Sequence, residues 1–265
     1  MHERERHRLI LKLVSEQGLA RVGQLAEALG VSEPTVRRDL NRLAGLNLLR
    51  KVRGGAEAMT QRMPQEIAGR PFAVSQSINT EKKRRIARKA VQLCRDGEAI
   101  IINGGTTTYM MAEFLHDRQL QILTNSFAMA ERLLAGSANR VIVPGGEIYR
   151  EQSIILSPFD NDTTQNHYAS KMFMGAQGLA PPGLIEVDPL LIRAEQKLIN
   201  QADQLIVLVD STKFRQRAGL ILCPLERIHT VITDDEVEPA AVKMLEAAGV
   251  EVIIAEAEER SSTAA

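Results

Sequence analysis

The stretch from Ser32 to Leu40 constrains the fold of this chain more than any other part of its sequence. An amphipathic segment, 22–29, precedes it after a break of only two residues, Gly30 and Val31. Ser32 can cap a new helix by accepting backbone N–H bonds, and a proline two residues later is tolerated in a first helical turn. The sequence therefore predicts two helices joined by a tight turn, which is the outline of a helix-turn-helix motif.

The second predicted helix has an apolar face and a polar face. On a helix with 3.6 residues per turn, Val36, Leu40 and Leu43 share one side and are expected to face the core. Side chains that project elsewhere, with two basic residues of the following segment, are candidates for DNA contacts: Ser32, Thr35, Arg37, Arg38, Asn41, Arg42, Lys51 and Arg53. We expect Thr35 and Arg38 to reach base edges and the two later basic residues to contact phosphates. The alternative is an ordinary solvated helix face, and Asp39 is expected to pair with a neighbouring arginine.

The residues around this motif extend it into a small domain. An earlier helix is indicated by four apolar residues at helical spacing, Leu9, Ile10, Leu13 and Val14. Residues 50–55 read Arg-Lys-Val-Arg-Gly-Gly, an extended basic segment that predicts a β-hairpin wing. We therefore predict a winged helix-turn-helix domain over residues 1–57. Residues 58–79 lack clean periodicity and carry two prolines and a glycine, which indicates a linker.

The formal net charge of zero hides an uneven distribution of charge along the chain. Residues 1–70 carry 13 lysines and arginines against 8 acidic residues, whereas the remainder carries 20 against 25. A basic N-terminal part on an acidic remainder suits a DNA-binding head on a body that does not bind DNA. Chance is the alternative explanation, because the excess of positive charge in the N-terminal part is modest.

Beyond the linker, short β-rich runs alternate with helical stretches. Strands are expected at 99–102, 121–124, 140–143, 205–209, 230–233 and 251–254, and helices around 81–94, 107–116, 126–135, 190–202 and 239–248. This alternation favours an α/β body, residues 80–256, with a mostly parallel sheet flanked by helices. Residues 257–265 are expected to form a disordered tail. The basic run 82–85 is expected to be a solvated helix face, with a second DNA site as the alternative.

Four loops of this body follow predicted strands and are rich in small polar residues. They are 103–108 (Asn-Gly-Gly-Thr-Thr-Thr), 124–126 (Thr-Asn-Ser), 144–146 (Pro-Gly-Gly) and 210–213 (Asp-Ser-Thr-Lys). The carboxyl ends of parallel strands meet at one edge of a sheet, where backbone N–H groups at helix starts attract anions. Each loop alone is a weak signal, because such residues occur in any turn. Four of them on one edge predict a site for a small molecule that carries a phosphate.

Several other kinds of site are not predicted. The sequence has neither a Gly-x-Gly-x-x-Gly pattern after a strand nor a Gly-x-x-x-x-Gly-Lys-Ser/Thr pattern, so no nucleotide cofactor is expected. Cys94 and Cys223 lie far apart without metal-ligand spacing, which argues against a disulfide framework and a metal site. No apolar run approaches the ~18–20 residues of a membrane helix, and the charged N-terminus leads into no signal peptide. We expect a cytoplasmic protein without a cofactor and without a membrane partner.

Taken in order, these motifs resemble those of the DeoR family of bacterial transcriptional regulators. In the predicted head the resemblance lies in 36–40 (Val-Arg-Arg-Asp-Leu) and 53–56 (Arg-Gly-Gly-Ala). In the predicted body it lies in the glycine- and threonine-rich segments and two charged ones: 105–108, 124–126, 145–146, 175–178, 195–197 and 210–214. The ordered set is highly specific and extends over nearly the whole chain.

The resemblance implies a winged head joined to a body similar to the ribose-5-phosphate isomerase and glucosamine-6-phosphate deaminase fold, used as a sugar-phosphate sensor. Carried over position by position, it implies four residues that cradle the phosphate, Gly105, Thr106, Thr107 and Thr108. It also implies four residues that line the same pocket, Asn125, Gly146, Lys197 and Lys213. Asn103 departs from the family pattern, in which aspartate is common, and Asn47 stands where glycine is common.

Some roles stay open at this point. Residues 152–158 and 194–198 resemble the L-ascorbate-utilisation regulators of this family, although a regulator of another sugar, such as rhamnose, could carry the same features. Lys197 could instead be a surface lysine of a helix. Asp188 and Glu195 could bind sugar hydroxyls or serve the fold alone.

The leading hypothesis is a repressor of a carbohydrate-catabolic operon that a phosphorylated sugar releases from operator DNA. Because helix-turn-helix proteins usually read paired half-sites, we expect a homo-oligomer, either a dimer or a tetramer. The first alternative is a sugar-phosphate isomerase or deaminase with an accessory DNA-binding head, in which Asp188 or Glu195 is the base and Lys197 stabilises the enediolate. Asn103, which cannot act as a general base, argues against it. A DNA-architectural protein with a vestigial pocket is the second alternative.

Overall fold

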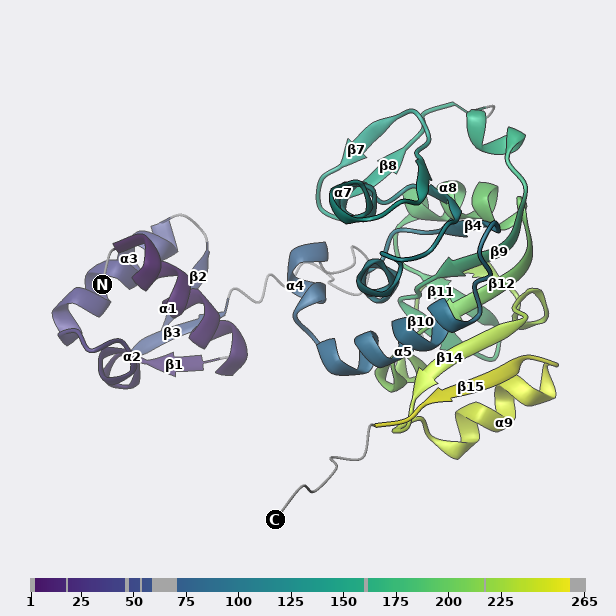
Figure 1. Cartoon of the computed structure of the whole chain (residues 1–265). Coiled ribbons are helices and arrows are strands. Elements are labelled where there is room, and N and C mark those ends of the chain that lie inside the picture. The colour runs from purple at the N-terminus through teal and green to yellow at the C-terminus, as the bar shows by residue number, and fades with distance from the viewer. Residues whose placement is uncertain are drawn as a thin grey trace, which may run out of the picture. The chain divides into compact units, whose positions relative to one another are not determined.

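The computed structural model describes residues 3–17, 19–45, 48–52, 54–58, 71–159, 162–216 and 218–257 (Figure 1). The chain divides into two compact units, residues 1–65 and 66–265. Asn47 and Arg53, both considered above, lie outside the described residues, as does most of the expected tail. In the described parts of the chain, no helix is long and apolar enough to cross a membrane.

The first unit is a winged helix-turn-helix domain, as the sequence predicts. Its described elements are α1 (Glu3–Gln17), β1 (Leu19–Arg21), α2 (Val22–Leu29), α3 (Glu33–Gly45), β2 (Leu49–Val52) and β3 (Gly55–Ala58). The wing is the antiparallel pair of β2 and β3, and β1, which the sequence analysis did not predict, adds to the other side of β3. Gly30 adopts a left-handed conformation with φ of 63° and ends α2, so the next helix can begin at once.

The core of the first unit forms where the predicted apolar stripes meet. Val36, Leu40 and Leu43 of α3 are buried against α1 and α2, which contribute Ile10, Val14 and Leu25 among others. All of these side chains are within 2% of complete burial. Transfer of such side chains out of water supplies about 1.5–3 kcal/mol each, which fixes the orientation of α3 and exposes its polar face.

The second unit begins inside the stretch that the sequence analysis assigned to a linker. Residues 72–76 form helix α4 (Phe72–Gln76), whose first N–H group donates to the carbonyl of Glu151 across 2.8 Å. The Phe72 ring meets Tyr109 edge to face, with 5.4 Å between ring centroids. The predicted linker therefore extends too far, because an aromatic contact and a backbone hydrogen bond attach its last residues to the body.

The described residues of the second unit form a parallel seven-stranded sheet in the order β15-β14-β12-β9-β4-β5-β6. These strands are β4 (Ala99–Ile102), β5 (Gln121–Thr124), β6 (Arg140–Ile142), β9 (Ala169–Met174), β12 (Ala202–Leu208), β14 (Thr230–Asp234) and β15 (Glu251–Ala255). The helices between them are α5 (Thr80–Gln92), α6 (Thr106–Tyr109), α7 (Phe127–Gly136), α8 (Pro189–Ile199) and α9 (Pro239–Ala247), with 3₁₀ turns η1 (Met110–Phe114), η2 (Thr163–Asn166), η3 (Ser211–Arg215) and η4 (Leu225–Arg227). The α/β prediction is confirmed.

Both faces of this sheet are covered by apolar side chains. Ile100 and Ile102 of β4 pack on one face with residues of α5, η1 and α7, whereas Ile101 points to the other face, which α8 and α9 cover. Side chains alternate between faces along a strand, so an Ile-rich strand serves two cores at once. The strand ends are then the part of the sheet left for a ligand.

Two smaller sheets accompany the large one. The hairpin of β7 (Glu147–Tyr149) and β8 (Ile154–Leu156) follows β6. The other sheet is antiparallel and consists of β10 (Gly178–Ala180) and β11 (Gly183–Glu186), which follow β9, and β13 (Leu220–Cys223), which follows η3. None of these five strands was predicted from the sequence, and neither was β9. The hairpin reaches the end of β5, because the N–H of Ile155 donates to the carbonyl of Asn125 across 2.7 Å.

Candidate DNA-binding surface and effector site

The polar face of α3 carries most of the predicted DNA contacts. Arg37, Arg38, Asn41 and Arg42 are exposed, and Thr35 is half-buried. Before the helix, Ser32 is also exposed, and its carbonyl accepts the first helical hydrogen bonds, from Thr35 and Val36. The side chains proposed to touch DNA are thus opposite the buried stripe of the same helix.

Local contacts hold several of these side chains in place. The hydroxyls of Ser32 and Thr35 lie 2.9 Å apart, and Arg37 pairs with Glu33 one turn earlier across 3.1 Å. Lys51 of the wing donates to Asn41 of α3, which ties the wing to the helix. Within the described part of the chain, Arg38 has no hydrogen-bonding or ionic partner. An exposed pair such as Arg37 with Glu33 contributes little, so a DNA phosphate can replace it.

Asp39 attaches helix α3 to the rest of the head. It is buried, and it accepts from Arg6 across 2.5 Å and contacts His7 Nε2 across 3.0 Å, both on α1. Burial alone would raise the pKa of Asp39, but hydrogen bonds and charge from Arg6 and His7 lower it below its ordinary value. Asp39 pairs with an arginine, as expected, and its role is to orient α3.

In the second unit, the parallel register brings the predicted loops to one edge of the sheet. Strands β4, β5 and β6 are neighbours, and β9 separates β4 from β12. At the end of β4, the N–H of Gly104 donates to Asn125 Oδ1 at the end of β5 across 2.8 Å. The hydroxyl of Thr108 donates to the carbonyls of Asn103 and Gly105, 2.8 and 3.0 Å away. Thr107 is also buried, whereas Gly105 and Thr106 remain partly exposed.

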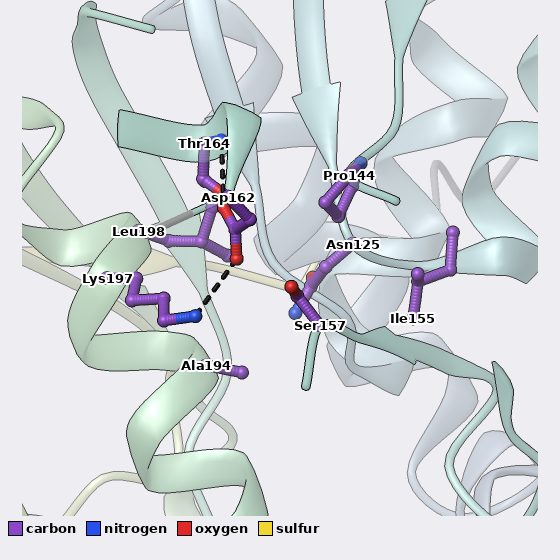
Figure 2. A pocket seen from close by; sticks show the side chains of 9 residues that line it. All are labelled: Asn125, Pro144, Ile155, Ser157, Asp162, Thr164, Ala194, Lys197 and Leu198. Atoms are coloured by element: carbon purple, nitrogen blue, oxygen red, sulfur yellow. Dashed lines mark hydrogen bonds and ion pairs between the residues drawn. The ribbon is translucent and has the colours of Figure 1, made fainter. Parts of the chain in front are cut away.

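A pocket opens beside these strand ends (Figure 2). Of the predicted ligand residues, it brings together Asn125 from the end of β5 and Lys197 from α8. The other residues that line it come from the loop after β6, from β8 and the loop after it, from η2 and from α8: Pro144, Ile155, Ser157, Asp162, Thr164, Ala194 and Leu198. The lining of this pocket does not include Gly105, Thr106, Thr107, Thr108, Gly146 or Lys213.

Lys197 and Asp162 point toward one another across this pocket (Figure 2). Their Nζ and Oδ2 atoms are 2.9 Å apart, and Lys197 also donates to the carbonyl of Phe159. Asp162 accepts further hydrogen bonds from the N–H of Thr164, 2.9 Å away, and from its hydroxyl. Burial alone would raise the pKa of Asp162, but these donors lower it to about 2. The pocket therefore contains an ion pair.

The remaining predicted ligand residues lie on neighbouring elements. Gly146 begins the turn into β7, where a Cβ atom would lie 2.2 Å from the carbonyl oxygen of Leu156, so this position needs glycine for the hairpin to close. Lys213 lies on η3. Burial raises the pKa of Glu186 above its ordinary value, and the charge of Lys213 opposes this shift in part. Gly105 is the N-cap of α6, where a Cβ atom would lie 3.9 Å from the N–H nitrogen of Gly175.

Three carboxyl groups are buried beneath the strand ends: Glu186 at the end of β11, Asp188 just before α8 and Glu195 within α8. Asn103 Nδ2 donates to Glu195 Oε1 across 2.7 Å, and burial raises the pKa of Glu195 well above its usual range, with Glu186 adding to the effect. Asp188 accepts from the N–H of Leu190 and caps α8. Burial raises the pKa of Tyr149 in the hairpin to about 12, and a hydrogen bond between this tyrosine and Asp188 adds to the shift.

Several buried polar atoms at this edge have no hydrogen-bond partner among the described residues. They are Asn103 Oδ1, Asn125 Nδ2 and Glu195 Oε2. A buried polar atom without a partner costs about 1–3 kcal/mol, so such atoms mark a position where a ligand or water completes the structure. Asn125 Nδ2 belongs to a residue that lines the pocket.

Ser157, Asp162 and Thr164 line the pocket but were not predicted from the sequence. They come from the segment between β8 and β9, and neither element was predicted, so nothing placed this segment over α8. One signal was available in the sequence. A lysine directed into a pocket requires a nearby hydrogen-bond acceptor, and Asp162 begins a short Asp-Thr-Thr motif in which an aspartate side chain can accept from the backbone N–H two residues later.

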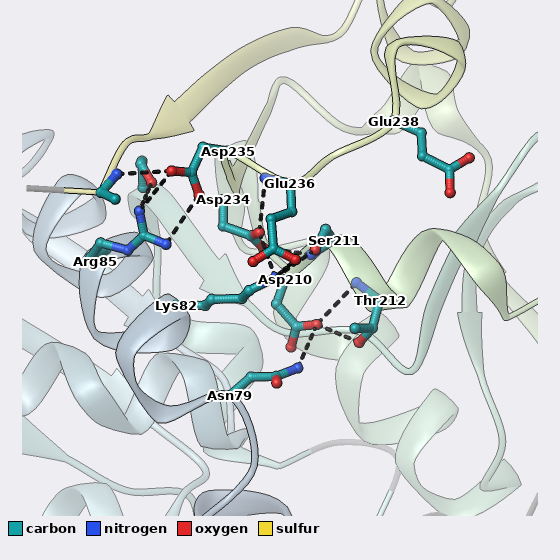
Figure 3. A network of polar contacts seen from close by, with 12 residues as sticks. Asn79, Lys82, Arg85, Asp210, Ser211, Thr212, Asp234, Asp235, Glu236 and Glu238 are labelled. Carbon is teal, nitrogen blue, oxygen red and sulfur yellow. Dashed lines mark hydrogen bonds and ion pairs between the residues drawn. The ribbon is translucent and has the colours of Figure 1, made fainter.

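A polar network connects the start of α5 with η3 (Figure 3). Lys82 donates to the hydroxyl of Ser211 across 3.0 Å and pairs with Asp234, 2.9 Å away, and Glu236, 2.7 Å away. Asn79, in a left-handed conformation with φ of 53°, donates to Asp210 across 3.2 Å. Asp210 in turn accepts from the N–H of Thr212 and caps η3, the turn that carries Lys213.

The basic run 82–85 is therefore not the solvated face that was expected. Lys83 is buried and donates to the carbonyl of Ser75 across 2.6 Å, and Arg84 pairs with Glu113. Arg85 donates to Asp235 across 3.2 and 3.1 Å. The acidic side chains that neutralise this run come from distant parts of the chain, which the sequence alone did not place near it.

Two family models match the chain. The DeoR-like helix-turn-helix domain matches residues 6–62, and the DeoR C terminal sensor domain matches residues 78–235. The chain belongs to the DeoR family. As a DeoR-family protein it is a DNA-binding transcriptional regulator with a sensor domain, and the enzyme alternative is not favoured.

Individual relatives agree with this membership of the DeoR family. The HTH-type transcriptional regulators UlaR of Shigella dysenteriae and of Escherichia coli O1:K1 are each 36% identical over 255 residues, which cover 96% of this chain and 99% of theirs. They confirm the expected resemblance to the L-ascorbate-utilisation group. A solved structure, ribose 5-phosphate isomerase A from Methanocaldococcus jannaschii, is similar over 51% of this chain and 55% of that chain, with 18% identity and a TM-score of 0.39.

Proposed function

We propose that this regulator represses a carbohydrate-catabolic operon and that a phosphorylated sugar, bound to the sensor domain, releases it from operator DNA. The observation that carries the proposal is the pocket at the carboxyl edge of the parallel sheet, which holds the cation of Lys197 beside the amide of Asn125. A lysine among hydroxyl and amide donors is suited to an anionic ligand with hydroxyl groups.

Each lining group has a proposed role toward such a ligand. Lys197 supplies positive charge to the phosphate, and Asn125 Nδ2, buried and without a partner among the described residues, supplies a neutral donor. Ser157 and Thr164 line the same pocket, and their hydroxyls hydrogen-bond to Asp162. Gly105 to Thr108, Gly146 and Lys213 remain proposed ligands on the same strand-end edge, where Thr106 and the first N–H groups of α6 provide further donors.

The proposed DNA contacts follow from the exposed face of α3. Thr35 and Arg38 read base edges, and Ser32, Arg37, Asn41, Arg42, Lys51 and Arg53 position the head on the phosphates. Two heads read paired half-sites, so the regulator acts as a homo-oligomer, a dimer or a tetramer, in the cytoplasm. The ligand favours an arrangement of the sensor that no longer matches the operator, and operator DNA then weakens ligand binding by the same factor.

The network around Lys82 offers a route for this coupling. It ties η3, which carries Lys213, to the first turn of α5 on the N-terminal side of the sensor domain. A shift of η3 upon ligand binding would therefore change contacts of Asn79 and Lys82. Coupling through such a network requires two discrete arrangements of its contacts.

A thermal-shift screen of the full-length protein tests the effector half of this proposal. Phosphorylated sugars are compared with their unphosphorylated forms, because a ligand that binds the folded state alone raises the melting temperature. We expect at least one phosphorylated sugar to raise it and its unphosphorylated form to have no effect. If no phosphorylated sugar has an effect at millimolar concentration, the sensor does not respond to this class of ligand.

A further inference from the structure

The effector pocket contains a carboxylate of its own. Asp162 is among the residues that line the pocket, and its Oδ2 lies 2.9 Å from Lys197 Nζ, the cation proposed to bind the effector. The side chain of Asp162 is 8% exposed and that of Lys197 is 16% exposed, so solvent screens this pair only in part. An anionic ligand that binds Lys197 therefore competes with this carboxylate.

We propose that Asp162 is a resident competitor, which an anionic effector must displace from Lys197 before the sensor responds. This inference rests on the proposed function and concerns the selectivity of the same site. Asp162 thereby sets a threshold: a phosphate group displaces it, whereas an uncharged sugar does not.

The contacts of Asp162 fit displacement better than a fixed structural role. Its other hydrogen bonds come from the N–H and hydroxyl of Thr164, two residues along the chain, and from Ser157, five residues before it, so these partners belong to the same segment between β8 and β9. Lys197, in contrast, joins α8 to this segment through Asp162 and through the carbonyl of Phe159. Exchange of the ion-pair partner of Lys197 therefore leaves the turn at Asp162 intact and changes only how the segment is attached to α8.

Charge explains the selectivity that follows. A phosphate monoester carries a charge of about −1.5 to −2 at pH 7 and three acceptor oxygens, whereas a carboxylate carries −1. A phosphate can therefore compensate Lys197 more fully than Asp162 does and can accept from Asn125 Nδ2 as well. A neutral sugar offers hydroxyls but no charge, so it would leave Lys197 with Asp162.

The test measures binding of inorganic phosphate to the full-length protein by isothermal titration calorimetry. Asp162→Asn keeps an oxygen that can accept from the N–H of Thr164 but removes the charge that holds Lys197. We expect this variant to bind phosphate about tenfold more tightly than the wild type, which is the effect of one charge-assisted hydrogen bond. Asp203→Asn, at an exposed aspartate hydrogen-bonded to Tyr168, makes the same change in net charge and is expected to leave the affinity unchanged.

Further variants separate competition from positioning. Lys197→Met in the Asp162→Asn background should abolish the gain in affinity, because the competitor acts through this lysine. Asp162→Ser, whose hydroxyl can also cap the turn, repeats the test if the asparagine variant does not fold. Phosphate binding that is unchanged or weaker in both Asp162 variants would overturn the inference, since Asp162 would then position Lys197. If neither the wild type nor the Asp162 variants bind inorganic phosphate, the inference is overturned, whereas the effector part of the proposed function is tested separately by the phosphorylated sugars of the thermal-shift screen.

Discussion

Asn103 at the end of β4 donates to Glu195 of α8 across 2.7 Å, and the other carboxyl oxygen of Glu195 has no partner among the described residues. Burial raises the pKa of this glutamate well above 4.5, and the charge of Glu186 raises it further. The folded state therefore holds the proton of Glu195 under conditions in which the unfolded chain has released it. Stability that this proton provides is complete below pH 4.5 and is lost as the pH rises toward the pKa of the folded state.

The change Glu195→Gln removes this dependence, because an amide can accept the same hydrogen bond from Asn103 without ionising. Relative to the wild type, we expect the variant to gain more stability at pH 8 than at pH 4, by at least about 2–4 °C in melting temperature. Differential scanning calorimetry across this range measures the difference. Glu246→Gln, at an exposed residue of α9, is the control, and an equal effect of Glu195→Gln at both pH values would contradict the assignment.

Arg38 is expected to read bases, because it is exposed on α3 and has no partner within the described residues of the head. We expect Arg38→Ala to weaken binding to the operator by about 1–3 kcal/mol and to leave binding to unrelated DNA nearly unchanged. The fold should persist, since the side chain points away from Val36 and Leu40. Fluorescence anisotropy with both DNA sequences measures this. Equal losses on both would show that Arg38 contacts phosphate alone.

Lys51 of the wing is expected to contact phosphate, which carries no sequence information. The change Lys51→Ala should weaken binding to operator and unrelated DNA alike, and it should reduce the slope of log affinity against log salt by about 1. The same anisotropy titrations, repeated at several salt concentrations, provide this slope. Loss of affinity for the operator alone would instead place Lys51 at a base edge.

Lys82 is expected to stabilise the sensor domain strongly, because its partner Asp234 is completely buried. Hydrogen bonds to Glu236 and Asp234 raise the pKa of this lysine although burial opposes them. We expect Lys82→Met to lower the free energy of unfolding by about 2 kcal/mol, the value of a hydrogen bond to a charged group. Urea denaturation measures the loss. Arg85→Met is the matched control, since Asp235 is partly exposed and its pair with Arg85 should contribute under about 1 kcal/mol.

Cys94 and Cys223 are expected to be unreactive in the folded protein. Burial raises the pKa of Cys94 to about 12 and that of Cys223 to about 11, so neither forms a thiolate in appreciable amount at pH 8. Titration with a chromogenic disulfide reagent should find no reactive thiol in the native protein and both thiols in urea. Rapid reaction of either cysteine without denaturant would show that the corresponding apolar cluster opens readily.

The head was predictable from sequence because its information is local. The spacing of Val36, Leu40 and Leu43 defines one helix face, and Gly30 defines the turn before it. In the sensor domain, the strands with continuous apolar runs, such as β4, were also predicted. Strand β9 was missed because the polar residues Ser170 and Lys171 interrupt its apolar pattern. Both side chains contact the carboxylate of Glu98, which directly precedes β4. Such compensation is a tertiary contact that no local pattern encodes.

The residues of the proposed effector site show the same division between local and tertiary information. Asn125 and Lys197 were predicted from the ends of β5 and from family motifs, and the structure places both in one pocket. Asp162 was not predicted, since its contact with Lys197 joins positions 35 residues apart, and Asp162 itself lies between β8 and β9, where the 3₁₀ turn η2 is the one regular element of the described residues. The family motifs predicted Lys197 as a ligand residue, which stays a prediction, and the fold adds its ion-pair partner Asp162.

The most direct test of the account is the affinity of the full-length protein for the promoter region beside its own gene, with and without phosphorylated sugars. In a gel-shift titration at fixed salt, we expect a specific complex that at least one phosphorylated sugar dissociates, while the unphosphorylated form of that sugar does not. The absence of a specific complex at every salt concentration would contradict the regulator, and a complex that persists with every phosphorylated sugar would contradict the proposed mode of release.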